Sequence, residues 1–321
     1  MNLRRPALRA TLALFLPFVL AATVAGQPAQ AALVATTNLT GSGAPALAKV
    51  GDRLYVGWTG STGTAAAKVL NVGYSTDQGL HIVKLANNER TPQNEGPALV
   101  ADPNSSGILI AWADGRARNT LTMSYFSGTA FSCRTSFIGI TTPHAPALAV
   151  DSSGQTYLAW TDAFRHLNIA LIDPGTCATT HAITMRNRTV LSQTSPYGPG
   201  LIFDSTVSLQ LLIAWAADNP AHTVTVGAFV GSASLVNVAN PEIPVYPTSG
   251  PSLAASGSDL YIAVRGADNH LYFGYSQGCR PTCFVASDIG TAVRSPIGSL
   301  ASGFVLAYFN GAGNLEIYSL L

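Results

Sequence analysis

The chain has 321 residues, a formal net charge of +1 and only 10% charged residues, where a typical soluble domain has about 25%. This balance excludes the strongly basic surface that binds nucleic acid or anionic lipid. The abundance of small and β-branched residues is typical of a protein built from strands and turns.

The first 31 residues have the features of an export signal peptide. A positively charged start precedes an apolar run over residues 10–25 and a small-x-small cleavage pattern. These features are carried by Arg4, Arg5, Arg9 and Ala29-Gln30-Ala31. A membrane anchor is the alternative, but the run is short and contains Pro17, whereas a bilayer span takes roughly 20 apolar residues. Cleavage would leave residues 32–321 as one domain of 321 − 31 = 290 residues with a charge of 1 − 3 = −2. We expect this chain to be secreted or to lie on the exterior of the cell envelope, with no membrane span.

Six repeated units follow, and each begins with a proline followed by small apolar residues. The prolines are Pro45, Pro97, Pro146, Pro199, Pro251 and Pro296. Their separations of 52, 49, 53, 52 and 45 residues give a period near 50. Such a period is too long for leucine-rich or ankyrin units and suits a four-stranded propeller blade.

Each unit carries the same succession of predicted strands. A second strand rich in branched and aromatic residues, as expected of a strand buried on both faces, covers residues 54–58, 108–112, 156–160, 211–215, 260–264 and 304–308. An alternating third strand begins near Leu70, Leu121, Leu167, Val224, Leu271 and Leu315. A glycine turn then leads to a more variable fourth strand, at Gly79, Gly128, Gly175, Gly231 and Gly278.

The sixth unit stops after its third strand, and residues 33–40 have the length and character of one extra strand. We therefore predict an all-β fold, a six-bladed β-propeller of four-stranded antiparallel blades that the N-terminal strand closes. An open ring would leave two apolar blade faces in water. A β-sandwich and a β-solenoid are the alternatives, but a sandwich does not need six equal units and a solenoid has shorter periods.

The unit that begins Pro45-Ala46-Leu47-Ala48 resembles the repeats of bacterial sialidase-like propellers, which have six blades and Asp-box hairpins. The likeness extends from about Pro45 to Leu321 and includes one Asp box, Ser75-Thr76-Asp77-Gln78-Gly79-Leu80-His81-Ile82, with Ile82 in place of the family's aromatic residue. The resemblance implies that Asp77 fixes a hairpin turn.

The catalytic motifs of sialidases are matched less completely. Arg90-Thr91-Pro92 and Arg294-Ser295-Pro296 resemble the family's Arg-Ile-Pro motif, but neither begins the first blade. No acidic residue and no Tyr–Glu pair can be assigned to the catalytic positions.

Polar side chains gather in the loops after the second strands, on one predicted rim. The ligand-binding candidates are Asp114, Arg116, Asp162, Arg165, His166, Asp218, Arg265, Asp268 and His270. Planar hydrogen-bonding groups of this kind bind sugars, and aromatic rings stack on the pyranose face. Four tryptophans stand just before such loops, Trp58, Trp112, Trp160 and Trp215. Because they recur at equivalent positions, we favour blade packing for the tryptophans, and for the Asp/Arg sets we favour local salt bridges over ligand contacts. In the first unit, residues 59–68 are expected to form a longer, nearly uncharged loop.

Catalysis would need a pair of carboxylates within roughly 5–10 Å of each other across a pocket. Glu95, which precedes Pro97 on a rim loop, and Asp162 are the candidates, although nothing in the sequence fixes their pairing. No phosphate-binding loop and no metal or cofactor motif is present.

The four cysteines are even in number, which in an exported chain predicts disulfides. Cys279 and Cys283 are near enough in sequence to staple one hairpin, and Cys133 would then pair with Cys177 across neighbouring repeats. A zinc site is the alternative, but there is no second close cysteine pair and no nearby histidine at ligand spacing.

Three functions are consistent with this sequence. The favoured one is a lectin-like protein that binds a glycan or another small polar ligand without a complete catalytic set. The alternatives are a divergent sialidase-like glycoside hydrolase and an extracellular scaffold for a protein partner. The polar loops differ from blade to blade, which suits one central pocket better than one site per blade.

Overall fold

The computed structural model describes residues 32–64, 67–76, 83–85, 89–92, 94–175, 182–205, 210–231, 235–241, 247–256, 259–276, 285–292, 300–301 and 305–319. The regular structure in these ranges consists of β-strands. They contain no helix with the length and apolar character that a bilayer crossing takes.

The strands form six antiparallel sheets, and in five of them neighbouring strands follow one another along the chain. The innermost strands are β2 (Ala46–Val50), β7 (Ala98–Ala101), β11 (Ala147–Val150), β15 (Gly200–Asp204), β19 (Ser252–Ser256) and β23 (Leu300–Ala301). The second strands are β3 (Arg53–Thr64), β8 (Ile108–Asp114), β12 (Thr156–Thr161), β16 (Gln210–Ala216), β20 (Asp259–Arg265) and β24 (Val305–Phe309). The third strands are β4 (Ala67–Ser75), β9 (Thr120–Phe126), β13 (His166–Asp173), β17 (Val224–Phe229), β21 (His270–Tyr275) and β25 (Asn314–Ser319). The outer strands are β5 (Val83–Leu85), β10 (Phe131–Thr141), β14 (Thr184–Thr194), β18 (Leu235–Ala239), β22 (Val285–Ala292) and β1 (Ala32–Thr40), while β6 (Arg90–Thr91) also pairs with β4.

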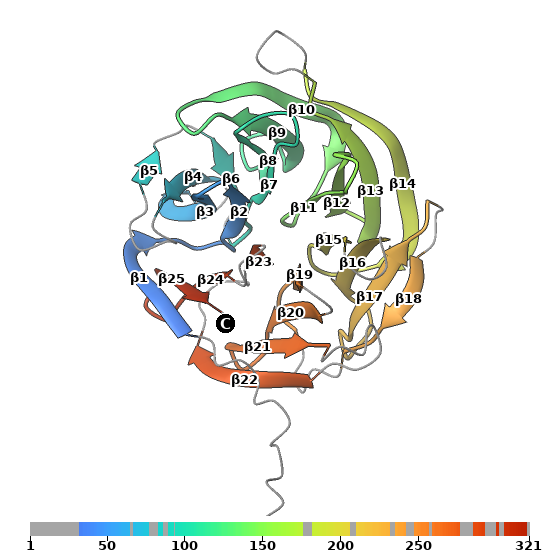
Figure 1. Ribbon diagram of the computed structural model, residues 1–321. Coiled ribbons are helices and arrows are strands. Elements are labelled where there is room, and N and C mark those ends of the chain that lie inside the picture. Colours follow the sequence, from blue (N-terminus) through green and yellow to red (C-terminus); the bar gives the residue numbers. More distant parts are fainter. Residues whose placement is uncertain are drawn as a thin grey trace, which may run out of the picture. The chain divides into compact units, whose positions relative to one another are not determined.

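The six sheets follow one another around a ring as the blades of a propeller (Figure 1). Each innermost strand contacts the innermost strand of the next blade, from β2 through β7, β11, β15 and β19 to β23, and β23 contacts β2 again. The predicted fold is therefore confirmed.

The N-terminal strand closes the ring as the sequence predicts. β1 pairs antiparallel with β25, and the register joins Ala32 to Ser319 and Thr40 to Asn314. The last blade thus has the strand order β1-β25-β24-β23, with strands from both ends of the described chain.

The hydrophobic core lies in the seams between blades. Alternate residues of a strand point to opposite faces, so β8 sends Ile108 and Ile110 toward the first blade, and Leu109 and Ala111 toward the third. Because both faces are covered, β8 is buried along its whole length.

Two local expectations have different outcomes. The turn glycines that the structure describes, Gly128, Gly175 and Gly231, have φ values of 98°, 60° and 79°, a conformation that favours glycine. The loop expected at residues 59–68 is instead an extended hairpin, because β3 and β4 keep pairing as far as Thr64 and Ala67. The register shift between Thr59 and Gly63 lets this hairpin bend while the pairing continues.

Candidate ligand-binding site

The loops that lead into the innermost strands, here called the lead-in loops, lie beside the loops that follow the second strands. Backbone hydrogen bonds join the two sets. The Ser195 amide donates to the Arg165 carbonyl over 2.9 Å, and the Thr248 amide donates to the Arg265 carbonyl over 2.9 Å. Both sets therefore share one end of the blades, as expected for the binding face.

A cavity of about 440 Å³ opens where the lead-in loops converge. Its wall is formed by the prolines and small apolar residues that begin the innermost strands of the first five blades. Its polar residues are Asn94, Glu95, His144, Tyr197, Thr248, Ser249, Ser252 and Arg265. A mostly apolar wall with a few polar groups is the usual make-up of a small-molecule site, and the volume is in the usual range of about 300–1,000 Å³.

The position two residues before the anchoring proline supplies half of this polar set. Blades two to five place Glu95, His144, Tyr197 and Ser249 there, and the first blade places Gly43. Since each blade contributes a different side chain, the arrangement makes one asymmetric pocket. Sequence reasoning missed His144 and Tyr197, which counting back from the prolines would have found.

Glu95 and His144 form a pair at the cavity. One carboxylate oxygen of Glu95 lies 3.2 Å from His144 Nδ1, and the other accepts the Ala145 amide over 2.7 Å. Both side chains are 22% exposed. The Thr59 hydroxyl donates to the Glu95 carbonyl, and the Thr142 hydroxyl donates to the His144 carbonyl over 2.8 Å. The carboxylate is thus held in one orientation, with part of its surface open to a ligand.

Tyr197 stands next to His144 around the cavity. Its ring meets His144 edge-on at 6.3 Å between centroids and His222 edge-on at 5.8 Å. Its backbone carbonyl accepts the hydroxyls of Thr161 over 2.6 Å and Ser195 over 2.9 Å. Burial raises the pKa of Tyr197 above its ordinary value, so the phenol is neutral near pH 7 and able to donate a hydrogen bond.

Arg265, at the end of β20, gives the cavity a positive charge. Burial lowers the pKa of its guanidinium below the ordinary value, although an arginine stays protonated in proteins. Its Nη2 donates to the Asn269 side chain, and its buried Nε has no hydrogen-bond partner within the described ranges. Among the described residues, no carboxylate forms an ion pair with this guanidinium.

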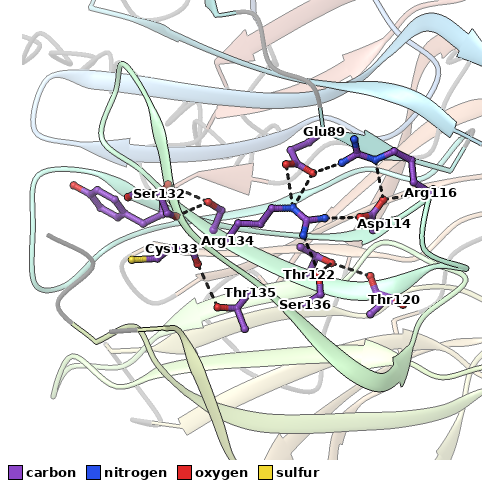
Figure 2. A network of polar contacts seen from close by, with 12 residues as sticks. Glu89, Asp114, Arg116, Thr120, Thr122, Ser132, Cys133, Arg134, Thr135 and Ser136 are labelled. Carbon is purple, nitrogen blue, oxygen red and sulfur yellow. Dashed lines mark hydrogen bonds and ion pairs between the residues drawn. The ribbon is translucent and has the colours of Figure 1, made fainter. Parts of the chain in front are cut away.

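Two of the predicted site residues, Glu95 and Arg265, line the cavity. The other predicted residues are not among its lining residues. Asp114 and Arg116 belong to a polar network between the first two blades, in which Arg134 lies between Glu89 and Asp114 (Figure 2). Arg134 Nη2 is 2.5 Å from Asp114, its Nε is 3.0 Å from Glu89, and Arg116 Nη2 is 2.9 Å from Glu89.

Asp162, the second catalytic candidate, fixes a turn between β12 and β13. One of its oxygens accepts the amides of Phe164 and His166 over 2.9 and 3.0 Å, and the other accepts the Asn168 side chain over 3.2 Å. Its carboxylate is therefore engaged with its own loop.

The remaining candidates make local contacts as well. Arg165 pairs with Asp218 over 2.9 Å. Asp268 accepts the His270 amide over 3.0 Å and the Tyr272 hydroxyl over 2.6 Å, and the pKa of Asp268 is lowered chiefly by that hydroxyl.

The four tryptophans pack between blades, as the favoured interpretation predicts. Trp58, Trp112 and Trp160 are at most 1% exposed and Trp215 is 5% exposed. Each faces the preceding blade, where it joins the core of that seam. Arg134 and Arg188 cover Trp112 and Trp160 at 5.9 and 5.5 Å from the ring centroids.

Several sequence-based expectations fall outside the described residues. They concern residues 1–31, the Asp box from Asp77 onward, Arg294, and the cysteines at 177, 279 and 283. The signal peptide and the disulfide pairing therefore stay predictions. Cys133 lies on β10. The described residues contain no group of three or more His, Cys, Asp or Glu side chains arranged to hold a metal ion.

No known protein-family profile matches the chain, and no curated protein matches it in sequence. Solved structures do match. The Hadza microbial sialidase Hz136 has a TM-score of 0.60 at 11% identity, over 86% of this chain and 65% of its own. Trypanosoma rangeli sialidase, solved as a covalent intermediate with 2,3-difluorosialic acid, has a TM-score of 0.58 at 10% identity, over 92% and 58%. The fucose-recognising lectin of Aleuria aurantia, a six-bladed β-propeller, has a TM-score of 0.57 at 10% identity, over 88% and 92%.

The chain shares their fold. It spans less than two thirds of the length of either sialidase but nearly the whole length of the lectin. At such identities the likeness shows the architecture, and the chemistry of the site has to be argued from its own residues.

Proposed function

We propose that the chain is a lectin-like propeller whose central cavity binds one sugar unit that carries a carboxylate. The observation that carries this proposal is Arg265, which pairs with no carboxylate among the described residues and lines a mostly apolar cavity together with Glu95, His144 and Tyr197. A guanidinium recognises a carboxylate through parallel N–H bonds. The Tyr197 hydroxyl supplies a hydrogen-bond donor for a sugar hydroxyl. The exposed part of the Glu95 carboxylate supplies an acceptor.

Binding accounts for this cavity better than glycoside hydrolysis by two carboxylates does. Glu95 is the one acidic side chain among the described lining residues, and it already accepts two hydrogen bonds. Asp162, the other catalytic candidate, is engaged in its own turn. Hydrolysis would need a second acid in the cavity.

We also propose that the protein acts outside the cell. The predicted signal peptide and the even number of cysteines support this location. The structural neighbours include a lectin that binds α-methyl-L-fucoside, which supports a glycan as the ligand class.

Calorimetric titration tests the proposal. The probes are N-acetylneuraminic acid, D-galacturonic acid, α-methyl-L-fucoside and glucose. We expect at least one of the two acids to bind, and Arg265→Gln to weaken it about tenfold or more, since a hydrogen bond to a charged group contributes roughly 1.5–3 kcal/mol. Arg186→Gln is the matched control, because Arg186 lies on β14 and pairs with Asp173.

The same preparation is assayed with the 4-methylumbelliferyl glycosides of both acids. Turnover that Glu95→Gln abolishes would replace the lectin proposal with the hydrolase. Failure of every probe to bind would remove the glycan and favour a protein partner.

A further inference from the structure

Phe164 is an exposed aromatic residue on the same face as the cavity. Its side chain is 80% exposed, and it is the one aromatic ring among the large exposed apolar side chains of the described residues. It lies in the turn between β12 and β13, directly before Arg165 in the sequence. An aromatic ring with this degree of exposure is the kind of platform on which the apolar face of a sugar stacks.

Hydrogen bonds order the backbone of the turn that carries this ring. The Phe164 amide donates to Asp162 Oδ1 over 2.9 Å, and the Arg165 amide donates to the Asp162 carbonyl over 3.0 Å. Arg165 has a φ of 67°, a left-handed conformation that the surrounding hydrogen bonds maintain. The ring is therefore presented by an ordered backbone, which lowers the entropy lost on binding.

Hydrogen bonds connect Arg165, the residue after Phe164, to the lining of the cavity. The Arg165 carbonyl accepts the Ser195 amide over 2.9 Å, and the Ser195 hydroxyl in turn bonds the carbonyl of Tyr197, which lines the cavity. The Tyr197 ring touches His222 edge-on, with 5.8 Å between centroids.

The surface beside this path carries groups that suit sugar hydroxyls. Arg165 and Asp218 pair over 2.9 Å with their side chains 58% and 29% exposed, so each has hydrogen-bonding capacity left. The Asp218 amide donates to the Thr194 carbonyl over 3.2 Å, which ties this pair to the lead-in loop of Tyr197. These contacts link Arg165, Asp218 and His222 to the lead-in loop of Tyr197, and Phe164 stands next to Arg165 in the same turn. We call these four residues the ledge.

We propose that this ledge is a second sugar subsite, on which the next unit of an oligosaccharide stacks on Phe164 while its first unit occupies the central cavity. The inference rests on the proposed function of the cavity and extends it. It also assigns Arg165 and Asp218, which the cavity leaves unused, to recognition of a longer glycan.

The test compares short and long probes by calorimetric titration of the protein. The pairs are D-galacturonic acid with trigalacturonic acid, and N-acetylneuraminic acid with 3′-sialyllactose. We expect the trisaccharide of a bound pair to bind about tenfold tighter than the monosaccharide. Phe164→Ala should remove about tenfold of affinity for the trisaccharide and leave the monosaccharide within about twofold, whereas Phe164→Tyr should keep the preference.

Ile138→Ala is the matched control, because Ile138 is 96% exposed on β10, away from this ledge. Thermal unfolding of each variant separates binding from folding, and we expect no change for a side chain as exposed as Phe164. Equal affinity for both members of a bound pair, or equal weakening of both by Phe164→Ala, overturns the ledge and leaves the cavity proposal standing. Failure of all four probes overturns both.

Discussion

The residue before each anchoring proline is small because the lead-in loops approach one another through their backbones. Ala44, Gly96, Ala145, Gly198 and Gly250 occupy this position in the first five blades. A Cβ placed on Gly198 would lie 2.2 Å from the Ala145 carbonyl oxygen, and one placed on Gly250 would lie 2.0 Å from the Gly198 carbonyl oxygen. Both neighbours are backbone atoms, so neither can yield by a rotamer change.

We therefore expect Gly198→Ala to lower the free energy of unfolding by about 1–3 kcal/mol, the usual cost of forcing extra volume into a packed site. Urea denaturation measures it. Ala145→Gly is the control at the equivalent position, where the expected loss of about 0.4–1 kcal/mol comes from the freer unfolded chain. A Gly198→Ala protein as stable as the parent would show that the loops move apart without cost.

Recurrence from blade to blade separates the residues that form turns from those that line the cavity. Asp114, Asp162, Asp268 and Asn310 recur after second strands, and each accepts an amide two residues farther along the chain. Their recurrence therefore reflects a turn-forming role, although the sequence alone predicts these loops to be rich in ligand-binding groups. His144 and Tyr197 occupy a position whose residue type varies from blade to blade, two residues before the proline. The sequence reveals them only through this spacing from the inner strand, which brings them to the axis.

Strands far apart in the chain are joined by the network around Arg134 on β10 (Figure 2). This arginine bonds Asp114 at the end of β8 and Glu89 just before β6, and the Asp114 side chain is only 3% exposed. A sequence cannot reveal such a network, because its members are 20 and 45 residues from Arg134. The order of strands within each blade was predictable, since every unit repeats the same hydrophobic pattern.

Arg134→Ala is expected to destabilise the protein by about 2–4 kcal/mol, because it leaves the buried carboxylate of Asp114 with a weaker partner, Arg116 at 3.6 Å. Chemical denaturation gives the value. Arg186→Ala serves as the control, since Arg186 is 64% exposed in its pair with Asp173 and such pairs contribute less than about 1 kcal/mol. Equal losses in the two variants would contradict a special role for the buried carboxylate.

At the scale of the whole molecule, closure was the feature that the sequence predicted best. Six prolines at nearly equal spacing fixed the number of blades, and a sixth unit with three strands left one place for residues 33–40. The central cavity follows from the same geometry, since the lead-in loops of a closed ring converge on its axis. Its ligand chemistry was less predictable, because it depends on which side chains reach the axis.

The pairing of β1 with β25 should therefore control both stability and binding. We expect a chain that begins at Gly41 to lose roughly 3 kcal/mol or more of unfolding free energy, given about 1 kcal/mol for each strand hydrogen bond, and to lose sugar binding as the inner loops separate. The chain that begins at Ala32 is the matched control, and a peptide of residues 32–40 added to the shortened chain should restore part of both properties. Differential scanning calorimetry and titration measure them. A shortened chain that melts at the same temperature and binds the same probe would mean that the other five blades hold the axis without closure by β1.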